Sequence, residues 1–362
     1  MKMLTIKIIS LILALFVFVS AFCGCSVQKE THNSKVYVQS EFAPLKRAVL
    51  SQSEMTFPDL TDDDCWARLD QIGLTDADRQ MLVEYLSEPE AFKKEWEAER
   101  EGLKSVLLKY GVEVLEPRHL TDKEIEIGCV ENGFTNGTGA TNFFSRDPFF
   151  TVGEHIIEGQ FRSPYRRLEV LPIRDILDKE TSENGAYHVS VPMIDVSDGV
   201  MSEKGPYLEG GDVLVYNKTV FVGNSGNASN EAGIKWLSDY LKHFGYKVTE
   251  VKLAPEILHL DCALSLVKEG LMVVCEEAFI NGLPKELKNW DKITVNKEDA
   301  INLATNGLPI NEKVYITDIA FKNTVGAELE KRGITVEYLD FKISRSLYGA
   351  FRCSAQPLLR CE

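Results

Sequence analysis

The chain has 362 residues, of which 44% are hydrophobic and 26% charged, a composition typical of a globular protein. Its formal net charge of -15 at pH 7 argues against nucleic acid and against an anionic membrane surface as partners. The same acidity is compatible with a small cationic substrate.

Residues 1–25 are predicted to be an export signal rather than part of the fold. Lys2 and Lys7 give a positive start, and the apolar run from 8 to 22 is shorter than a membrane-spanning helix, which needs about 20 residues. The run ends at Gly24-Cys25, which resembles a bacterial lipobox and predicts Cys25 as the acylated residue. An ordinary signal peptide or an uncleaved anchor is the alternative interpretation.

The domain boundaries follow from this signal. Residues 26–35 are predicted to be a polar tether, and residues 36–362 a single α/β domain. We expect that domain to be exported and lipid-anchored to the membrane, on the outer face of the bacterial cytoplasmic membrane or on the outer membrane.

The first part of the domain alternates strand and helix patterns. A strand pair is predicted at Val36–Gln39 and Ala48–Ser51, and a further strand at Val112–Leu115. Residues 59–109 carry helix signals, including an amphipathic helix over Glu88–Tyr110, and we interpret them as a helical insertion.

The rest of the domain repeats a unit of hairpin, helix and strand. Three hairpins are predicted around short polar or glycine-containing turns, at 149–158, 213–222 and 263–275. A helix over Asn230–Phe244 and a strand over Lys247–Val251 complete the second unit, and a weaker unit runs from 301 to 339. Such a repeat predicts units that bury their faces against each other, and a plain mixed α/β fold is the alternative.

An acidic residue precedes each of the three clear hairpins, namely Asp147, Asp212 and Asp261. If the units surround an axis, these equivalent strand ends converge on one cavity. Three neighbouring carboxylates repel one another unless a cation lies between them. A guanidinium or ammonium group of a substrate would supply that cation.

The cysteines form no recognisable metal motif. Beyond the signal they are Cys65, Cys129, Cys262, Cys275, Cys353 and Cys361. They include no CxxC pair, so we expect no zinc site, while their even number in an exported chain is compatible with disulfides. Cys353 is predicted to lie where a strand passes into a loop. Three roles are open for it, namely a buried structural residue, a disulfide partner of Cys361 and a reactive thiol.

Two further segments carry candidate functional residues. His259 and Asp261 share a face if their segment is a strand, so that the imidazole can move protons while the carboxylate orients it or binds substrate. Glu209-Gly210-Gly211-Asp212 precedes a predicted strand, and its glycines indicate a turn or a close approach of the backbone. An acidic surface loop is the alternative for the second segment.

In this order, the residues resemble the guanidino-group-modifying superfamily, which includes glycine amidinotransferase, arginine deiminase and dimethylargininase. The resemblance runs from Glu41 to Arg360, and its strongest pieces are Ser145-Arg146-Asp147-Pro148, Glu209-Gly210-Gly211-Asp212, His259-Leu260-Asp261 and Arg352-Cys353-Ser354. The segment Ser163-Pro164-Tyr165-Arg166-Arg167 is most similar to the amidinotransferase branch. Arg352 stands where the family often has histidine, and a cation there would favour an ionised thiol.

The resemblance implies a five-bladed α/β propeller of the pentein type, with Cys353 as nucleophile and His259 as general acid and base. It implies that Asp147 and Glu209 grip the guanidinium, with Asp261 also at the site. Arg166 would hold a substrate carboxylate, and Asp212 is placed among the substrate-binding acids by the hairpin pattern. No metal and no organic cofactor is implied.

The function implied is an amidinotransferase-type enzyme that attacks the guanidino group of arginine or a related guanidine through a covalent cysteine thiouronium. One alternative is a hydrolase of the arginine deiminase or dimethylargininase type, and another is a non-catalytic guanidine-binding lipoprotein. The expected partners are a small cationic guanidino substrate such as arginine and, for a transferase, an amine acceptor. The sequence leaves open the donor, the acceptor and the oligomeric state.

Overall fold

The computed structural model describes residues 35–55, 80, 83–84, 87–131, 141–199 and 202–361. The chain divides into two compact units, Met1–Asn33 and Ser34–Glu362, and the described residues belong to the second. The predicted export signal with Cys25, nearly all of the tether, and the helix signals within 59–79 lie outside them. No helix of the described part combines the length and the apolar character needed to cross a membrane.

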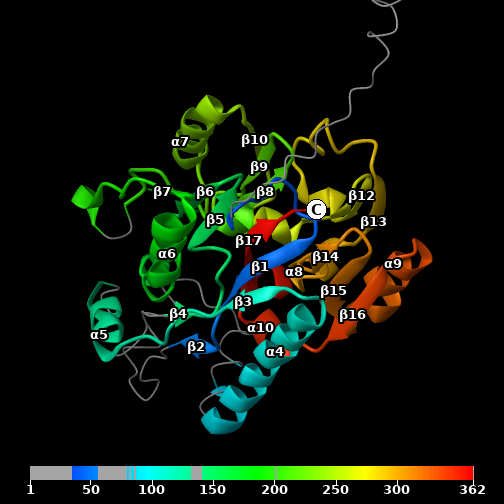
Figure 1. The fold of residues 1–362 in the computed structure, drawn as a ribbon, viewed down its shortest axis with the longest axis horizontal. Coiled ribbons are helices and arrows are strands. Elements are labelled where there is room, and N and C mark those ends of the chain that lie inside the picture. Colours follow the sequence, from blue (N-terminus) through cyan, green and yellow to red (C-terminus); the bar gives the residue numbers. More distant parts are fainter. Residues whose placement is uncertain are drawn as a thin grey trace, which may run out of the picture. The chain divides into compact units, whose positions relative to one another are not determined.

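The fold is of the α/β class, and one sheet pattern recurs through the described residues (Figure 1). In each three-stranded sheet two strands pair antiparallel and a third lies parallel to the middle one. The sheets are β5 (Phe149–Val152), β6 (His155–Glu158) and β7 (Tyr187–Ser190); β8 (Val213–Tyr216), β9 (Thr219–Asn224) and β10 (Lys247–Lys252); β11 (Leu264–Lys268), β12 (Leu271–Val274) and β13 (Asp291–Thr294); β14 (Leu308–Asn311), β15 (Val314–Asp318) and β16 (Thr335–Leu339); and β17 (Ala355–Arg360), β1 (Leu45–Leu50) and β3 (Glu113–Leu115). A small sheet pairs β2 (Glu54–Met55) with β4 (Thr141–Asn142).

In four of these sheets a helix connects the middle strand to the third, and Figure 1 shows these helices at the periphery. They are α4 (Pro89–Lys109), α6 (Arg174–Asn184), α7 (Glu231–Leu241) and α9 (Ala327–Lys331), the last preceded by a π-helical turn at Lys322–Gly326. The other α-helices of the described part are α5 (Asp122–Glu131), α8 (Lys297–Ile301), α10 (Lys342–Ser346) and α11 (Phe351–Ser354). Three short 3-10 helices bear on the site: η1 (Pro164–Arg166), η4 (Gly210–Asp212) and η6 (Leu260–Cys262).

Helix α7 shows how the sequence determines these connections. Asn230 caps its start, since its side chain accepts a hydrogen bond from the backbone N–H of Gly233 at 2.9 Å. Ile234, Leu237 and Leu241 follow at helical spacing and are buried against the sheet. The chain turns back at Gly245, whose φ of 77° lies in the left-handed region that glycine adopts without strain.

Helix α4 corrects one part of the expectation that residues 59–109 form a helical insertion, namely residues 89–109, whereas residues 59–79 lie outside the described residues. It lies between β1 and β3, which pair in parallel, so it takes the position that α6 and α7 take in their sheets. The expected strand pair of Val36–Gln39 with Ala48–Ser51 is also wrong. Both edges of β1 are occupied, one by β17 and one by β3, and residues 37 and 38 make only single bridges, to Leu359 and Gly153.

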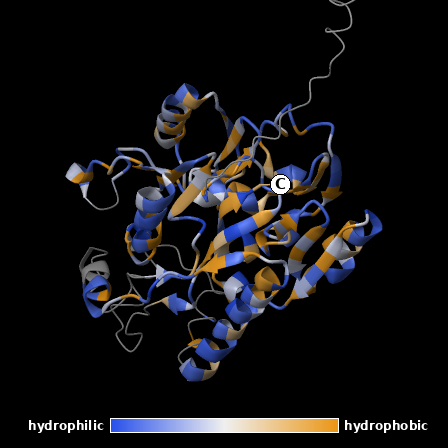
Figure 2. Cartoon of the chain, in the orientation of Figure 1, coloured by the Kyte–Doolittle hydropathy of each residue, from blue (hydrophilic) through white to orange (hydrophobic). Residues whose placement is uncertain are grey.

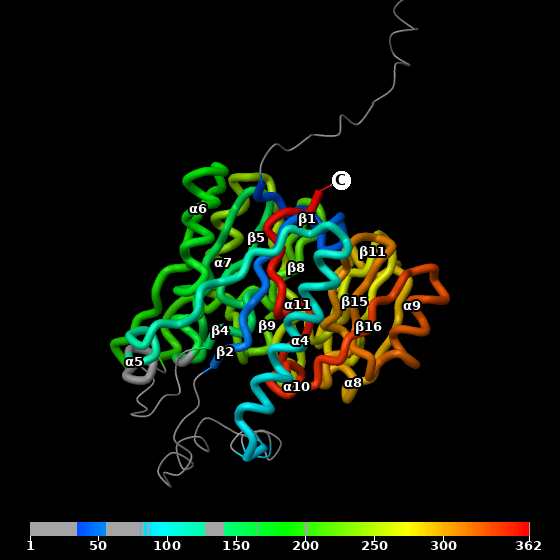
Figure 3. The backbone as a smooth tube through the Cα atoms, turned by 60° about the horizontal axis from the view of Figure 1, so that its bottom comes forward, coloured from blue at the N-terminus to red at the C-terminus, as the bar shows by residue number. Residues whose placement is uncertain are grey.

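The first and last strands of the fold lie side by side. Strand β17 pairs antiparallel with β1, with Ala355 opposite Leu50 and Arg360 opposite Leu45. Figure 3 shows the red C-terminal segment with α11 running along the blue β1. Hydrophobic residues gather on the strands, as Figure 2 shows, and the largest buried cluster joins residues from β1, α4, β12 and β15. This packing fixes the turn that carries Cys353, which directly precedes β17.

Candidate active site

Cys353 lies in the helical turn α11 rather than in the expected passage from strand to loop. Its side chain is buried, and its Sγ lies 3.3 Å from Nδ2 of Asn306 and 3.6 Å from Oδ2 of Asp261. The Oδ1 of Asn306 accepts hydrogen bonds from the backbone N–H groups of Ala350 at 3.1 Å and Cys353 at 3.3 Å. Asn306 could not be predicted as part of the site, because nothing local marks a loop residue before β14 as a neighbour of the turn that carries Cys353.

Cys353 and Cys361 are both free thiols, as are Cys262 and Cys275. Cys353 is buried, whereas Cys361 is partly exposed at the end of β17. The alternative in which Cys353 pairs with Cys361 is therefore wrong. The thiol of Cys353 is not held in that disulfide.

His259 faces two carboxylates that come from other segments. Its Nε2 lies 2.9 Å from Oε2 of Glu209, and its Nδ1 lies 3.9 Å from Oδ1 of Asp147. The expectation that His259 and Asp261 share one face of a strand is wrong. His259 is the extended residue before η6, whereas Asp261 lies within that 3-10 turn and points to Cys353.

The two carboxylates determine the charge of His259. Burial alone would lower the pKa of its imidazole, but Asp147 and the hydrogen bond to Glu209 outweigh that effect and raise the pKa to about 10. At neutral pH the imidazole is therefore a buried cation that can donate a proton.

The thiol of Cys353 has the opposite tendency. Burial raises its pKa well above the ordinary value, and the negative charges of Asp261 and Asp147 raise it further. Arg352, which was expected to place a cation beside the thiol, pairs instead with two carboxylates, since its nitrogens lie 2.9 Å from Oδ2 of Asp261 and 3.2 Å from Oε2 of Glu41. The thiol is therefore protonated when no external cation is near.

Asp147 and Asp212 differ in what their oxygens contact. The Oδ2 of Asp147 accepts a hydrogen bond from Arg166 at 2.9 Å, and its buried Oδ1 has no hydrogen-bond partner among the described residues. Both oxygens of Asp212 accept backbone N–H groups, from Leu260 at 3.0 Å and Ser229 at 3.1 Å, and burial raises its pKa to about 7. Asp147 thus offers an oxygen to a ligand, whereas Asp212 joins η6 to the neighbouring loop.

Gly211 makes the close backbone approach that the sequence suggested for the Gly-Gly segment. A Cβ atom at this position would lie 2.6 Å from Nδ1 of His259 and 2.7 Å from Oδ1 of Asp147. Only glycine leaves room for these two side chains as they stand. The segment after Glu209 therefore forms one wall of the site.

Aromatic and arginine side chains cover Cys353 on the side of α4. Trp96 packs on Phe143 with ring centroids 5.7 Å apart, and Phe143 packs on Phe144 at 4.5 Å; Cys353 belongs to the same buried cluster. Arg100 donates to the carbonyl of Phe143 at 2.8 Å, and burial lowers its pKa to about 10. Sequence patterns did not indicate this role for α4, since the contacts join segments far apart in the chain.

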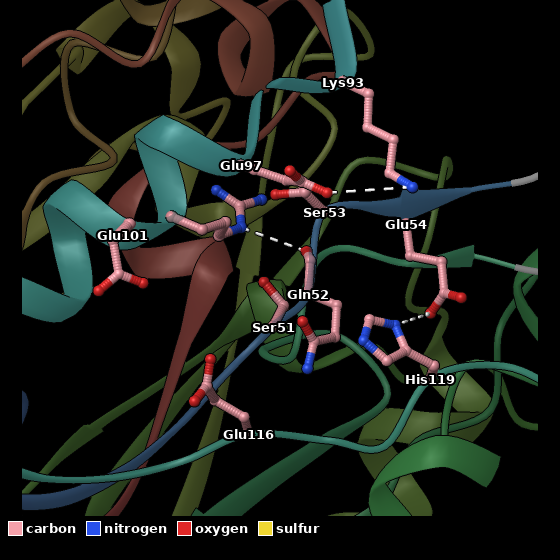
Figure 4. A pocket seen from close by; sticks show the side chains of 10 residues that line it. Ser51, Gln52, Ser53, Glu54, Lys93, Glu97, Glu101, Glu116 and His119 are labelled. Carbon is pink, nitrogen blue, oxygen red and sulfur yellow. Dashed lines mark hydrogen bonds and ion pairs between the residues drawn. The ribbon is translucent and has the colours of Figure 1, made fainter. Parts of the chain in front are cut away.

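A pocket of about 270 Å³ opens beside this cover, between α4 and the residues that follow β1 (Figure 4). It is lined by Ser51, Gln52, Ser53, Glu54, Lys93, Glu97, Arg100, Glu101, Glu116 and His119. Its charged side chains are paired in part, with His119 3.5 Å from Glu54 and Lys93 4.0 Å from Glu97. The pocket adjoins the cover of Cys353 and includes none of the acids around His259.

The fold and this arrangement define an enzyme that modifies guanidino groups. Residues 80–360 match the family model described as N,N dimethylarginine dimethylhydrolase, eukaryotic, and the chain belongs to that family.

Individual relatives include a protein of unassigned activity and an amidinotransferase. The chain is 30% identical over 220 residues to the uncharacterized protein YkgA of Bacillus subtilis (strain 168), covering 60% of this chain and 70% of that one. It is 27% identical over 298 residues to inosamine-phosphate amidinotransferase 1 of Streptomyces glaucescens, covering 75% and 82%. Among solved structures, an inosamine-phosphate amidinotransferase of Streptomyces griseus has a TM-score of 0.71 at 22% identity, with 91% and 97% covered, and so has the same fold.

Proposed function

We propose that the chain is an amidinotransferase-type enzyme that takes the amidino group of arginine, or of a related guanidine, onto Cys353 as a thiouronium. One observation carries the proposal. One buried group of acidic side chains brings together the free thiol of Cys353, the protonated imidazole of His259 and an oxygen of Asp147 that has no hydrogen-bond partner among the described residues. A planar guanidinium fits this group, because it brings both N–H donors and positive charge.

The first half of the reaction transfers the amidino group to sulfur. A guanidinium cation beside Cys353 lowers the pKa that burial raises, and the thiol loses its proton to solvent. The thiolate then adds to the guanidinium carbon, which the carboxylates of Asp147 and Glu209 orient. His259 donates a proton to the departing nitrogen as the carbon–nitrogen bond breaks, so that a neutral amine leaves.

The second half returns the enzyme to its first state. His259, now neutral, accepts a proton from the incoming amine as that amine attacks the thiouronium carbon. The carbon–sulfur bond breaks and releases a new guanidino compound together with the thiolate, which then regains from solvent the proton that it lost. If water attacks instead, after a terminal nitrogen has left as ammonia or a methylated amine, the product is a ureido compound such as citrulline.

The experiment is to incubate the full-length chain with arginine alone, with glycine, and with an amino-inositol phosphate. Ornithine together with a new guanidino compound, formed only with an acceptor, is the result expected of a transferase. Intact-mass analysis of the rapidly quenched enzyme is expected to show an amidino adduct on Cys353. Neither products nor adduct with any of these substrates would overturn the proposal.

A hydrolase is the second candidate, and the family model favours it because its description names a dimethylarginine hydrolase. Incubation with N,N-dimethylarginine distinguishes the two. Release of dimethylamine and citrulline without an acceptor would support the hydrolase and exclude the transferase as the main activity.

We also infer that the five three-stranded sheets of the described residues are the blades of a five-bladed α/β propeller. The support is their common strand pattern and the pairing of β17 with β1, which joins the two ends of the repeat in one sheet. A crystal structure in which the five sheets fail to surround one axis would contradict the inference.

For the N-terminal segment we propose export and lipidation at Cys25, on the sequence features of residues 1–25. Metabolic labelling with a radioactive fatty acid is expected to mark the wild-type chain and not Cys25→Ser. Equal labelling of both chains, or of neither, would contradict lipidation at that residue.

A further inference from the structure

Arg166 lies in a cage of carboxylates from three segments. Its Nε is 2.7 Å from Oε1 of Glu169, and its Nη2 is 2.9 Å from Oδ2 of Asp147 and 2.9 Å from Oε2 of Glu169. Its Nη1 is 3.6 Å from Oε2 of Glu209. The ring of Phe161 covers the guanidinium, with its centroid 4.5 Å from Cζ. All three nitrogens of Arg166 therefore face acidic groups of the protein itself.

This arrangement conflicts with the role that the family resemblance implied for Arg166. A guanidinium carries five N–H donors in a fixed plane, and the Nε and Nη2 donors of Arg166 are taken by Asp147 and Glu169. Its Nη1 lies 3.6 Å from Oε2 of Glu209. A substrate carboxylate placed beside Arg166 would meet these protein carboxylates at short range and be repelled. Arg166 is thus poorly placed to hold the carboxylate of a substrate.

The same contacts determine how the acids around His259 are oriented. Arg166 takes Oδ2 of Asp147, which leaves Oδ1 buried, without a hydrogen-bond partner among the described residues, and 3.9 Å from Nδ1 of His259. It also lies beside the Glu209 oxygen that pairs with Nε2 of His259. One guanidinium thereby aligns two carboxylates from different segments on the two nitrogens of one imidazole.

We propose that Arg166 is a positioning residue, which holds Asp147 and Glu209 in register and leaves Oδ1 of Asp147 as the acceptor for the guanidinium of the substrate. The proposal rests on the proposed function and deepens it. Because Arg166 acts through the two acids, its effect depends on the guanidino end of the substrate alone. A substitution of Arg166 should then lower kcat/KM by the same factor for guanidines with and without a carboxylate.

The test compares arginine with agmatine, which has the same guanidino end and no carboxylate, for the full-length wild type and Arg166→Lys. Lysine keeps the charge but has a single ammonium, which cannot hold two carboxylates in a fixed plane. We expect kcat/KM to fall at least about 10-fold for both substrates, mainly through kcat, with their ratio unchanged within about 2-fold. Arg174→Lys is the matched control, since Arg174 pairs with Glu158 at 2.9 Å and is half-exposed outside the site.

A loss confined to arginine, mainly in KM, would overturn the proposal and assign Arg166 to the substrate carboxylate. Unchanged kinetics with both substrates would overturn it as well. Arg166→Met serves as a second variant. If its circular dichroism spectrum matches that of the wild type, a loss of activity comes from lost alignment of Asp147 and Glu209 and not from unfolding.

A second measurement keeps this test separate from the proposed function. Alkylation of Cys353 is followed by mass spectrometry with 2-chloroacetamidine, a cationic planar reagent, and with neutral iodoacetamide. If Arg166 positions the acids, the preference of Cys353 for the cationic reagent falls several-fold in Arg166→Lys and is kept in Arg174→Lys. An equal preference in Arg166→Lys and Arg174→Lys would overturn the positioning role of Arg166. This measurement needs no turnover. A protein that converts no guanidine would therefore contradict the proposed function without deciding the role of Arg166.

Discussion

Arg352 and Cys353 are neighbours in the chain, and both contact the same oxygen of Asp261. Its Oδ2 accepts a hydrogen bond from Nη1 of Arg352 at 2.9 Å and lies 3.6 Å from Sγ of Cys353. Arg352 also contacts Glu41 and donates to the carbonyl of Val213 at 2.7 Å. The ion pair that balances the buried charge of Asp261 therefore also influences the electrostatic surroundings of the thiol.

Replacing Arg352 by methionine is expected to destabilise the fold strongly. Asp261 and Glu41 would lose a buried counter-charge, and breaking such a pair costs about 3–5 kcal/mol. Urea denaturation measures the loss, with Arg352→Lys expected to show a smaller one. Arg332→Met is the control, because its pairs with Asp291 and Glu328 are partly exposed and worth about 0–1 kcal/mol. Equal losses in the two methionine variants would contradict this account.

Cys353→Ser is expected to lower kcat by at least about 10³-fold and to remove the covalent adduct, because a serine hydroxyl is a far weaker nucleophile at this position. The fold should persist, since the substitution is nearly isosteric. Cys275→Ala is the control, because Cys275 is buried at the end of β12 and has no contact with the acids of the site. An active Cys353→Ser enzyme would rule out sulfur as the nucleophile.

Glu209→Gln is expected to lower the pKa of His259 from about 10 towards its ordinary value, because it removes a hydrogen-bonded negative charge. Because the pKa of His259 is higher in the folded chain than in the unfolded chain, protonation of His259 stabilises the fold. This contribution is complete below about pH 6.5 and is lost as pH rises through about 10. The free energy of unfolding of the wild type should fall across that window, and that of Glu209→Gln should fall less. Glu203→Gln is the control, because Glu203 is exposed and pairs with Arg162. Its free energy of unfolding should vary with pH as that of the wild type does. Identical pH profiles for all three chains would contradict the assignment.

Much of the repeated unit could be predicted from the sequence. The β5–β6 hairpin lies where the turn at Gly153 placed it, and the positive φ of Gly153, Asn217 and Gly270 explains why these turns could be recognised from the sequence. The β14–β15 hairpin was predicted only weakly, because its turn at residues 312–313 has no residue with a positive φ and no glycine to mark it. Helices of four or five residues, such as α11, are too short to leave a periodic pattern.

Of the candidate site, the sequence could predict the residue types and not their pairings. Cys353, His259, Asp147, Glu209 and Asp261 do lie together. The partners of His259 come from separate loops, and no local spacing shows that Glu209 and not Asp261 pairs with it. Long-range contacts of this kind are decided by tertiary packing.

Gly211→Ala is expected to impair activity with little loss of overall structure. The added methyl group would lie 2.6 Å from Nδ1 of His259, so the imidazole must move away from Asp147. We expect kcat to fall about 10²-fold, as small misplacements of catalytic groups do. Gly102→Ala is the matched control, since its nearest neighbour would be a side-chain atom of Leu339 at 3.5 Å. Full activity of Gly211→Ala would show that the imidazole has freedom to shift.

The pairing of β1 with β17 has a consequence for how the protein matures. The turn bearing Cys353 and β17 are synthesised after all the other described helices and strands, and β1 keeps an open edge until they arrive. Removal of β17 would leave that edge free to pair with other chains. In the proposed mechanism, the nucleophile and the strand that completes the first sheet therefore become available at the same stage of synthesis.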